Sequence, residues 1–277
     1  MRRPKYSEEE IKRIYDEEYI GKGISITKLR LLYCNSIDGY FIYRKYPLTS
    51  KKVKINSRKK KFGSEILKDF SVLDKNTAYI LGLLYADGWV SESPSKHVSI
   101  SLKNEDRYLL EIIKDYLSVG VNLRKIKNST LLVLNSKEMF DNVINLGLKL
   151  KKTNNIMRLP SLLEDYYSHF LRGFFDGDGT VFKDRKWLKA NLCSVDKEFL
   201  EEIQIILTKN NIYSVINTEK RKGRLMKNPD GYTIANFDMH RLFIRKQEDL
   251  KKFYEYLYRD CDNFFLTRKR EKFTKNY

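Results

Sequence analysis

A nine-residue segment that occurs twice constrains the fold of this chain more than any other feature. Its two copies are Ile80–Gly88 (ILGLLYADG) and Leu171–Gly179 (LRGFFDGDG), each an apolar helical stretch with a central glycine and a final Asp-Gly pair. The central glycines, Gly82 and Gly173, are 91 residues apart. The same order of predicted elements follows each copy. This spacing favours one internally duplicated fold over a solenoid of short repeats.

Hydrophobic periodicity predicts the order α-β-β-α-β-β-α in each copy. After the first motif helix we expect a strand carrying Val98, Ile100 and Leu102, a helix at 104–117, strands at 121–127 and 130–134, and a helix at 136–147. After the second we expect strands at 180–183 and 188–194, a helix at 196–209, strands at 213–220 and 232–238, and a helix at 246–258. The predicted fold class is therefore α+β, with pseudo-symmetric halves at residues 71–160 and 161–277.

The motif has two features that are locally unfavourable in a helix. A glycine in a helix interior costs about 0.5–1 kcal/mol relative to alanine, but it lets a neighbouring backbone approach, so two tightly packed motif helices are expected. Asp87 and Asp178 each place a carboxylate at the negative end of a helix dipole, at a cost of about 0.3–1 kcal/mol. A divalent cation between two such carboxylates would turn repulsion into attraction. An Asp-Gly pair is also an ordinary helix stop with a left-handed glycine, but its recurrence in matching units favours the functional interpretation.

The charge of the chain predicts a polyanionic partner. Lys and Arg number 54 against 36 Asp and Glu, a net charge of +18, which fits nucleic acid. The charge also fits an anionic membrane surface, but the sequence has no basic amphipathic helix with a clean Trp/Leu face opposite its lysines. The longest apolar run, 78–86, is too short to span a bilayer, so we expect no membrane partner. Cys34, Cys193 and Cys261 are too widely spaced for a CxxC zinc site, and their odd number argues against a disulfide framework. With no apolar signal segment at the start, we expect an intracellular protein.

Residues 1–70 form a third predicted region. Short helices are expected at 7–19, beginning with a Ser7–Glu10 capping box, at 25–33 and at 38–44. This pattern is typical of a helix-turn-helix module and equally of any small three-helix bundle. The stretch from Arg44 to Lys68 has ten Lys or Arg and a single acid, Glu65. It is either a phosphate-contacting linker or a solvated loop.

The paired motifs and the units that follow them resemble the LAGLIDADG homing endonuclease family in its two-motif, single-chain form, over about residues 76–275. The resemblance implies that the motif helices form the interface between two halves whose antiparallel sheets make a saddle over DNA. It implies that Asp87 and Asp178 bind the metal ions and that the carbonyls of Ala86 and Gly177 complete the coordination. The earlier motif acid is Tyr85 in the first copy, but that position is not the metal ligand, so Tyr85 is no evidence of inactivity.

The activity implied by the resemblance is metal-dependent, site-specific hydrolysis of one phosphodiester on each DNA strand. Mg²⁺ is the expected ion, because hard carboxylate and carbonyl oxygens surround it, and other divalent cations are left open. The family also places a basic residue beside the scissile phosphate after the last helix of each half. We expect Lys152 and Lys269 in these roles, or Lys151 and Arg268 if the register slips by one. The structural alternative is a lysine that neutralises a helix C-terminus.

The expected partner is double-stranded DNA with a long recognition site, bound by a monomer. The candidate base- and phosphate-contacting residues are Lys96, Lys125 and Lys127 in the first half and Lys183, Arg185, Lys189, Lys220, Arg221 and Arg224 in the second. Strand alternation allows only half of them to face DNA. A binder without cleavage on the same fold, either an intron RNA maturase or a transcription regulator, is the alternative. The acids at both motif ends favour the nuclease, with intron RNA left open as a further partner.

Overall fold

The computed structural model describes residues 7–14, 16–17, 68–93, 95–150, 157–228 and 231–274. The chain divides into two compact units, residues 1–67 with 118–120 and residues 68–117 with 121–277. Helix α1 (Glu8–Ile14) belongs to the first unit and starts with the predicted capping box, because Ser7 N donates to Glu10 Oε2 (2.8 Å) and Glu10 N to Ser7 Oγ (3.3 Å). The helices expected at 25–33 and 38–44, and all of the basic linker except Lys68, lie outside the described residues.

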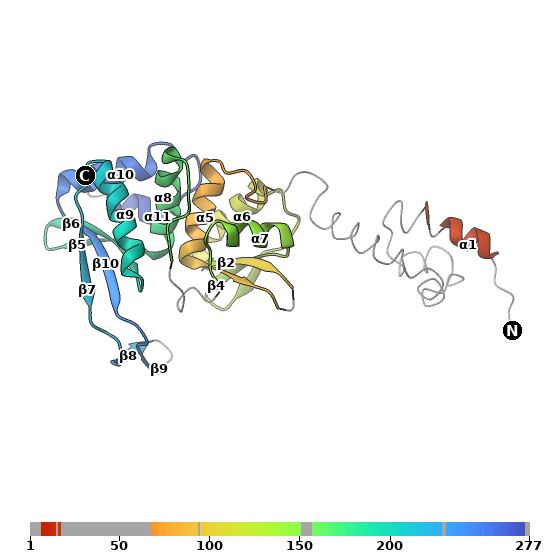
Figure 1. Cartoon of the computed structure of the whole chain (residues 1–277), viewed down its shortest axis with the longest axis horizontal. Helices are drawn as coiled ribbons and strands as arrows, with labels where there is room; N and C mark the ends of the chain where they lie inside the picture. The colour runs from red at the N-terminus through yellow and green to blue at the C-terminus, as the bar shows by residue number, and fades with distance from the viewer. Residues whose placement is uncertain are drawn as a thin grey trace. The chain divides into compact units, whose positions relative to one another are not determined.

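The second unit consists of two halves with the predicted order αββαββα (Figure 1). The first half contains α5 (Lys75–Asp87), β1 (Gly88–Ser91), β2 (His97–Lys103), α6 (Arg107–Tyr116), β3 (Arg124–Ile126), β4 (Ser129–Leu134) and α7 (Lys137–Asn145). The second half contains α8 (Tyr167–Asp178), β5 (Gly179–Asp184), β6 (Trp187–Ser194), α9 (Lys197–Lys209), β7 (Val215–Glu219), β10 (Met239–Ile244) and α10 (Gln247–Tyr258). Strand β1 was predicted only through the order of elements, with no residues assigned to it. The hairpin of strands β8 (Leu225–Asn228) and β9 (Gly231–Ile234), and helix α11 (Thr267–Thr274), were not predicted as such.

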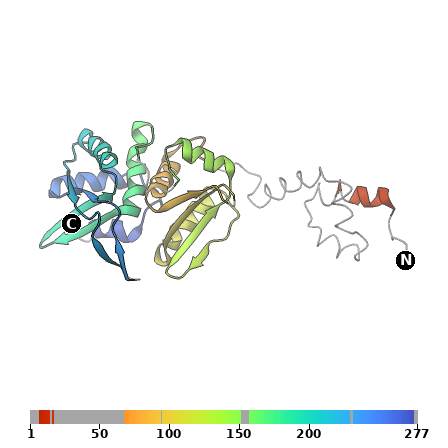
Figure 2. The same ribbon diagram turned by 60° about the horizontal axis from the view of Figure 1, so that its bottom comes forward.

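Each half has one four-stranded antiparallel sheet, with strand orders β1-β2-β4-β3 and β5-β6-β10-β7. Helices α5, α6 and α7 pack on the first sheet, and α8, α9 and α10 on the second. The side chains that alternate toward the helices are buried, as Val98, Ile100 and Leu102 illustrate. Within the described part of the chain, no helix covers the opposite face of either sheet, called here its outer face. Figure 2 shows the two sheets on either side of α5 and α8.

Helices α5 and α8 form the centre of this unit and approach each other at the motif glycines. A Cβ added at Gly82 would lie 1.9 Å from the carbonyl oxygen of Phe170, and one at Gly173 would lie 2.0 Å from that of Tyr79. No side chain fits at either position, so the two backbones are in direct contact. The predicted tight packing of the motif helices is confirmed.

The prediction of the last strand of the second sheet was wrong. Residues 232–238 were expected to form it, whereas Met239–Ile244 is the sheet strand and Gly231–Ile234 is the second strand of an inserted hairpin. Both segments have side chains that favour strands, and the segment chosen in the prediction, 232–238, comes first along the chain. Only pairing with β6 and β7, seen in the structure, distinguishes the two. Among the described residues, no helix is long and apolar enough to cross a membrane.

Candidate active site and nucleic-acid interface

The last acid of each motif lies at the C-terminal end of its helix, where α5 and α8 are side by side. A Cβ added at Gly177 would lie 2.2 Å from the Cβ of Ala86 and 3.0 Å from Oδ2 of Asp87. The Asp87 carboxylate therefore lies against the backbone of the residue that precedes Asp178. Both carboxylates are also close enough to Lys269 to raise its pKa. The structure thus brings the four predicted metal-binding residues together from the two halves.

The glycine after each acid is not a left-handed helix cap. Gly88 and Gly179 both have φ of −91° and extended ψ, and a β-strand begins at each. Their lack of a side chain matters for space instead, since a Cβ at Gly88 would lie 2.6 Å from the Cα of Leu84 and one at Gly179 would lie 2.4 Å from the carbonyl oxygen of Phe175. The ordinary helix-stop interpretation does not describe these positions.

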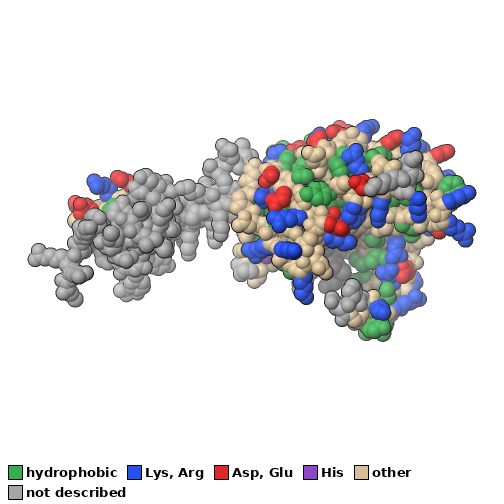
Figure 3. Space-filling model, turned by 180° about the vertical axis from the view of Figure 1, so that it is seen from behind, with side chains coloured by type: hydrophobic (Ala, Val, Ile, Leu, Met, Phe, Trp, Pro, Cys, Tyr) green, Lys and Arg blue, Asp and Glu red, His purple; other side chains and the backbone are tan. Residues whose placement is uncertain are grey.

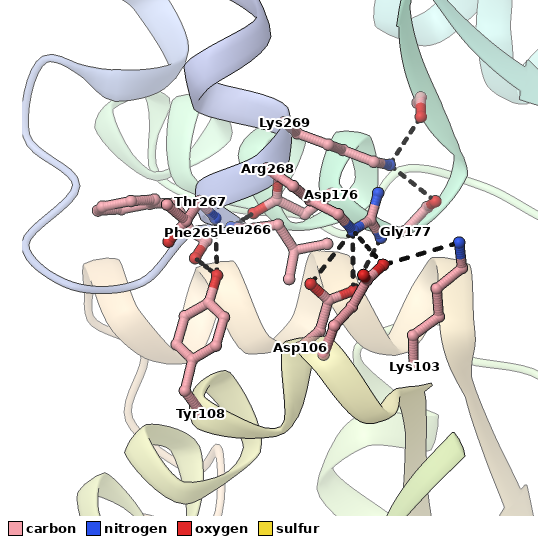
Figure 4. Close-up of polar contacts among 12 residues, drawn as sticks. Lys103, Asp106, Tyr108, Asp176, Gly177, Phe265, Leu266, Thr267, Arg268 and Lys269 are labelled. Atoms are coloured by element: carbon pink, nitrogen blue, oxygen red, sulfur yellow. Dashed lines mark hydrogen bonds and ion pairs between the residues drawn. The ribbon is translucent and has the colours of Figure 1, made fainter. Parts of the chain in front are cut away.

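The predicted basic residue of the second half, Lys269, is buried at the C-terminal end of α8. Its ammonium group donates to the carbonyl oxygens of Phe175 (2.7 Å), Gly177 (3.0 Å) and Gly179 (2.6 Å). Burial lowers the pKa of Lys269 to about 8, against the opposing effect of nearby carboxylates led by Asp176. Figure 4 shows the side chain pointing from α11 toward the backbone at Gly177. Lys269 therefore caps the helix whose last residue is Asp178, which is the geometry of the structural alternative.

Arg268, the alternative to Lys269, has a different place. Its Nε and Nη2 donate to Oδ2 of Asp106 at 3.0 and 2.9 Å, so its guanidinium is held by a carboxylate of the first half (Figure 4). This geometry supports Lys269 over Arg268 as the basic residue at the motif ends. Their first-half counterparts, Lys151 and Lys152, both lie outside the described residues.

The earlier position of each motif anchors the chain that follows the last helix of its half. Asp176 is fully buried, and its Oδ2 accepts hydrogen bonds from Tyr79 Oη and from the backbone N of Leu266, both at 2.8 Å. Burial raises the pKa of Asp176 to about 6. In the first half, Tyr85 Oη donates to the carbonyl of Leu146 at 2.8 Å. The two different side chains thus hold corresponding segments.

The donor set fits a hard divalent cation. Two carboxylates and nearby backbone carbonyls are oxygen ligands, and two protein carboxylates leave room for the waters and phosphate oxygens with which Mg²⁺ is usually bound. No group of three or more His, Cys, Asp or Glu side chains suited to a metal occurs within the described part of the chain. The candidate donors named above are oxygen atoms, whereas structural zinc sites use mainly nitrogen and sulfur ligands.

On the first sheet, cross-strand partners show which candidates reach the outer face, because paired residues point the same way. Lys125 pairs with the buried Thr130, so it lies on the helix-covered side. Its neighbour Arg124 pairs with Leu131 on the outer face and was missed by the sequence interpretation. Lys127 is exposed in the turn that joins β3 and β4.

Lys96 lies before β2 and turns toward α7. Its ammonium group is 2.6 Å from Oδ1 of Asp141 and lies over the ring of Phe140. Because both partners belong to a helix on the covered side of the sheet, we leave Lys96 out of the proposed DNA-contacting set.

On the second sheet, Lys183 pairs with the buried Leu188 and so lies on the covered side, while Lys189 pairs with Phe182 on the outer face. Arg241, missed by the sequence interpretation, lies on the outer face beside Asn217. The remaining candidates occupy turns: Arg185 between β5 and β6, and Lys220, Arg221 and Arg224 between β7 and β8. Strand alternation would have identified Arg241, had the position of β10 been known.

The family model of the LAGLIDADG-like domain matches residues 74–138 and 165–258. Among curated proteins of Methanocaldococcus jannaschii, the chain is 26% identical to the uncharacterized protein MJ0398 over 204 residues, which cover 72% of this chain and 70% of that protein. It is 23% identical to the uncharacterized protein MJ1054 and 25% to the RNA polymerase subunit Rpo1C, over 49% and 54% of this chain. The matches span only 17% and 18% of the length of those two proteins.

The comparison with solved structures finds homing endonucleases at low identity. The structure of I-DmoI with DNA and calcium is 16% identical, with a TM-score of 0.46, and the match covers 73% of this chain and 98% of that one. The meganuclease I-SmaMI bound to uncleavable DNA is 13% identical, with a TM-score of 0.46, over 74% of this chain and 88% of that one.

Proposed function

Because the chain belongs to the LAGLIDADG-like domain family, we propose that it is a metal-dependent, site-specific endonuclease that cuts both strands of DNA. The observation that carries the proposal is the proximity of two acids, Asp87 and Asp178, at the C-terminal ends of α5 and α8. One acid comes from each half. Two pseudo-symmetric acids suit a duplex, whose two strands each present one phosphodiester to be hydrolysed.

In this proposal, Asp87 and Asp178 hold divalent cations, for which Mg²⁺ is the expected ion, together with the carbonyls of Ala86 and Gly177. When bound, the metal lowers the pKa of the attacking water and stabilises charge on the phosphate. The Gly177 carbonyl already accepts a hydrogen bond from Lys269, but a carbonyl oxygen has a second lone pair for a further partner. The ammonium of Lys269 keeps α8 in place and adds positive charge near the scissile phosphate.

The outer faces of the two sheets are the proposed surface for the duplex. They carry Arg124 on the first sheet and Lys189 and Arg241 on the second, with Lys127 and Arg185 in the adjoining turns. Two sheets that flank the paired helices would extend the contact along the duplex in both directions, so a long recognition site is expected. The net charge of +18 supports a strong, salt-dependent attraction to phosphates.

The test is cleavage of a library of duplexes in Mg²⁺ by the wild type and by Asp87→Asn and Asp178→Asn. We expect site-selective double-strand cuts by the wild type and loss of cutting by either variant, with DNA binding retained. Asp115→Asn, which changes a carboxylate that is 78% exposed on α6, is the matched control and should cut normally. Tight binding of DNA or structured RNA with no cutting under any divalent cation would contradict the proposal and favour a binder on the same fold.

A further inference from the structure

The hairpin β8–β9 breaks the symmetry of the two halves. It lies between β7 and β10, whereas the equivalent strands of the first half, β3 and β4, are joined by the short turn at 127–128. Leu225 pairs with Ile234, and Lys227 with Tyr232. Since alternate residues of a strand share a face, these four side chains form one face of the ribbon. Its three apolar members are exposed, Leu225 by 66%, Ile234 by 62% and Tyr232 by 67%.

Hydrogen bonds between Asp238 and residues 220–222, called here the joint, hold the base of the hairpin at the end of the sheet. Asp238 Oδ1 accepts hydrogen bonds from the backbone N of Arg221 (2.9 Å) and Lys222 (3.1 Å), and its Oδ2 accepts one from Lys220 Nζ (2.9 Å). These contacts, led by the one with Lys220, lower the pKa of Asp238 to about 2. The backbone N of Gly223 donates to Ala235 O at 2.8 Å and closes the ribbon beyond the joint. The apolar face is therefore presented by a backbone held at its base.

Basic groups connect the hairpin with the outer face of the sheet. Glu219 at the end of β7 accepts hydrogen bonds from both Arg221 at the joint and Arg241 on the outer face. Residues 220–235 contain five Lys or Arg and one acid. Figure 3 shows hydrophobic and basic side chains together on this projection, at the lower right of the view. The basic side chains therefore call for an anionic partner. The exposed apolar face calls for small apolar groups on the same partner.

Duplex DNA meets both conditions. Its major groove admits a two-stranded ribbon, and the thymine methyl is an apolar group on the base edges there. We propose that the β8–β9 hairpin enters the major groove at one flank of the site, with Leu225 and Ile234 against thymine methyls and with Arg224 and Lys227 near phosphates. This inference rests on the proposed function only in taking DNA as the partner. It predicts an asymmetric footprint, longer on the side read by the second half.

The first experiment selects bound duplexes from a random pool with Asp178→Asn protein, with and without the added pair Leu225→Ser and Ile234→Ser. We expect the added pair to abolish a thymine preference at one outer flank, with central preferences unchanged, and to weaken binding about tenfold. Leu163→Ser, at a leucine that is 69% exposed outside the hairpin, is the matched control. Identical selected sequences and footprints with and without the pair would overturn the proposal.

The second experiment replaces the flanking thymines of the selected duplex by deoxyuridine, which removes only the methyl groups. Binding by protein with the intact hairpin should weaken severalfold, while binding by the hairpin variant should not change further. Methylation protection at guanine N7 in the flank supports the major groove, whereas protection at adenine N3 alone overturns it. These are binding measurements in an Asp178→Asn background, and they are therefore independent of cutting. The predicted effects of the hairpin can be absent while the wild type cuts DNA, or present while it does not.

Discussion

At two of the motif positions that differ between the copies, space and the polarity of a neighbouring backbone group account for the difference. Ala86 and Gly177 occupy equivalent places, and a second Cβ would lie 2.2 Å from that of Ala86. The gap between the helices holds one methyl group, so one copy has alanine and the other glycine. At the earlier acid position, Tyr85 donates to a carbonyl and Asp176 accepts from a backbone N–H. Each side chain matches the polarity of the backbone group it meets.

The motif acids could be predicted from the sequence because their signal is local and occurs twice. The role of Arg172 could not, although it stands inside the second motif. Its side chain is fully buried and donates to the carbonyls of Phe264 and Leu257, both at 2.8 Å. Those partners are more than 80 residues away in the sequence. Nothing near Arg172 in the chain indicates that these two carbonyls will bind its buried guanidinium.

His169 should make the protein sensitive to acid. Burial lowers its pKa to about 4, and Arg172 Nη1 lies 3.0 Å from its Nδ1, which accepts only when unprotonated. As pH falls from about 6.5 to about 4, the unfolded chain gains a proton at this ring before the folded one does, so stability is lost over that window. We expect a loss of about 1–2 kcal/mol between pH 7 and pH 5 from this group. Urea unfolding at both pH values should show a smaller difference for His169→Asn, and an unchanged difference would contradict this assignment.

At the scale of elements, the sequence could not decide which side of β3 faces outward. The strand has three residues, all exposed at a sheet edge, so no buried residue marks its inner side. Its pairing with β4 reveals that Arg124, rather than Lys125, shares the outer face. A different difficulty affected β10. The strand-forming segment 232–238, part of which belongs to the hairpin strand β9, was taken for the sheet strand, and only pairing with β6 and β7 identifies Met239–Ile244. Helix boundaries were predicted better because caps such as Ser136 and Asp196 are local signals.

The contact between α5 and α8 should not tolerate a methyl group at either motif glycine. In most helices Gly→Ala is favourable by about 1 kcal/mol, but here the added Cβ would lie within 2.0 Å of a carbonyl oxygen of the facing helix. We expect Gly82→Ala and Gly173→Ala to lower the free energy of unfolding by about 3 kcal/mol or more. Gly223→Ala is the contrasting variant, because that site has open space and only a left-handed φ of +80°, with a cost of about 1–2 kcal/mol. Urea denaturation measures all three, and a neutral Gly82→Ala would refute the close contact.

At the scale of the second unit, the two halves have a second region of contact beside the motif helices, called here the seam. The segment between α10 and α11 and the start of α11 contact the first half. Lys75 lies 3.0 Å from both Asp260 and Asp262, and Tyr108 Oη donates to Phe265 O at 3.2 Å. The duplicated motif predicted the halves and their helical interface. This seam escaped prediction because it follows the last periodic helix and pairs residues more than 150 positions apart.

The bridge between Asp106 and Arg268 provides the test of this seam. Asp106 is 3% exposed at its side chain and Arg268 36%, so removing the arginine leaves a buried carboxylate without its partner. We expect Arg268→Gln to cost about 3 kcal/mol and Asp106→Asn somewhat less, because the freed guanidinium is partly solvated. The D106N/R268Q double variant should be more stable than the sum of the single losses predicts, by about 1–3 kcal/mol.

Urea unfolding of the wild type, the two single variants and the double variant measures this double-mutant cycle. Arg107→Gln is the matched control, since Arg107 is exposed and pairs with Glu111 along the same helix at 3.0 Å, a contact worth about 0.5 kcal/mol or less. If the seam holds the halves together, Arg268→Gln should also weaken cutting in Mg²⁺, because the helix that carries Lys269 begins one residue before Arg268. Additive losses in the cycle would show that Asp106 and Arg268 act independently, and the halves would then be joined by α5 and α8 without help from this bridge.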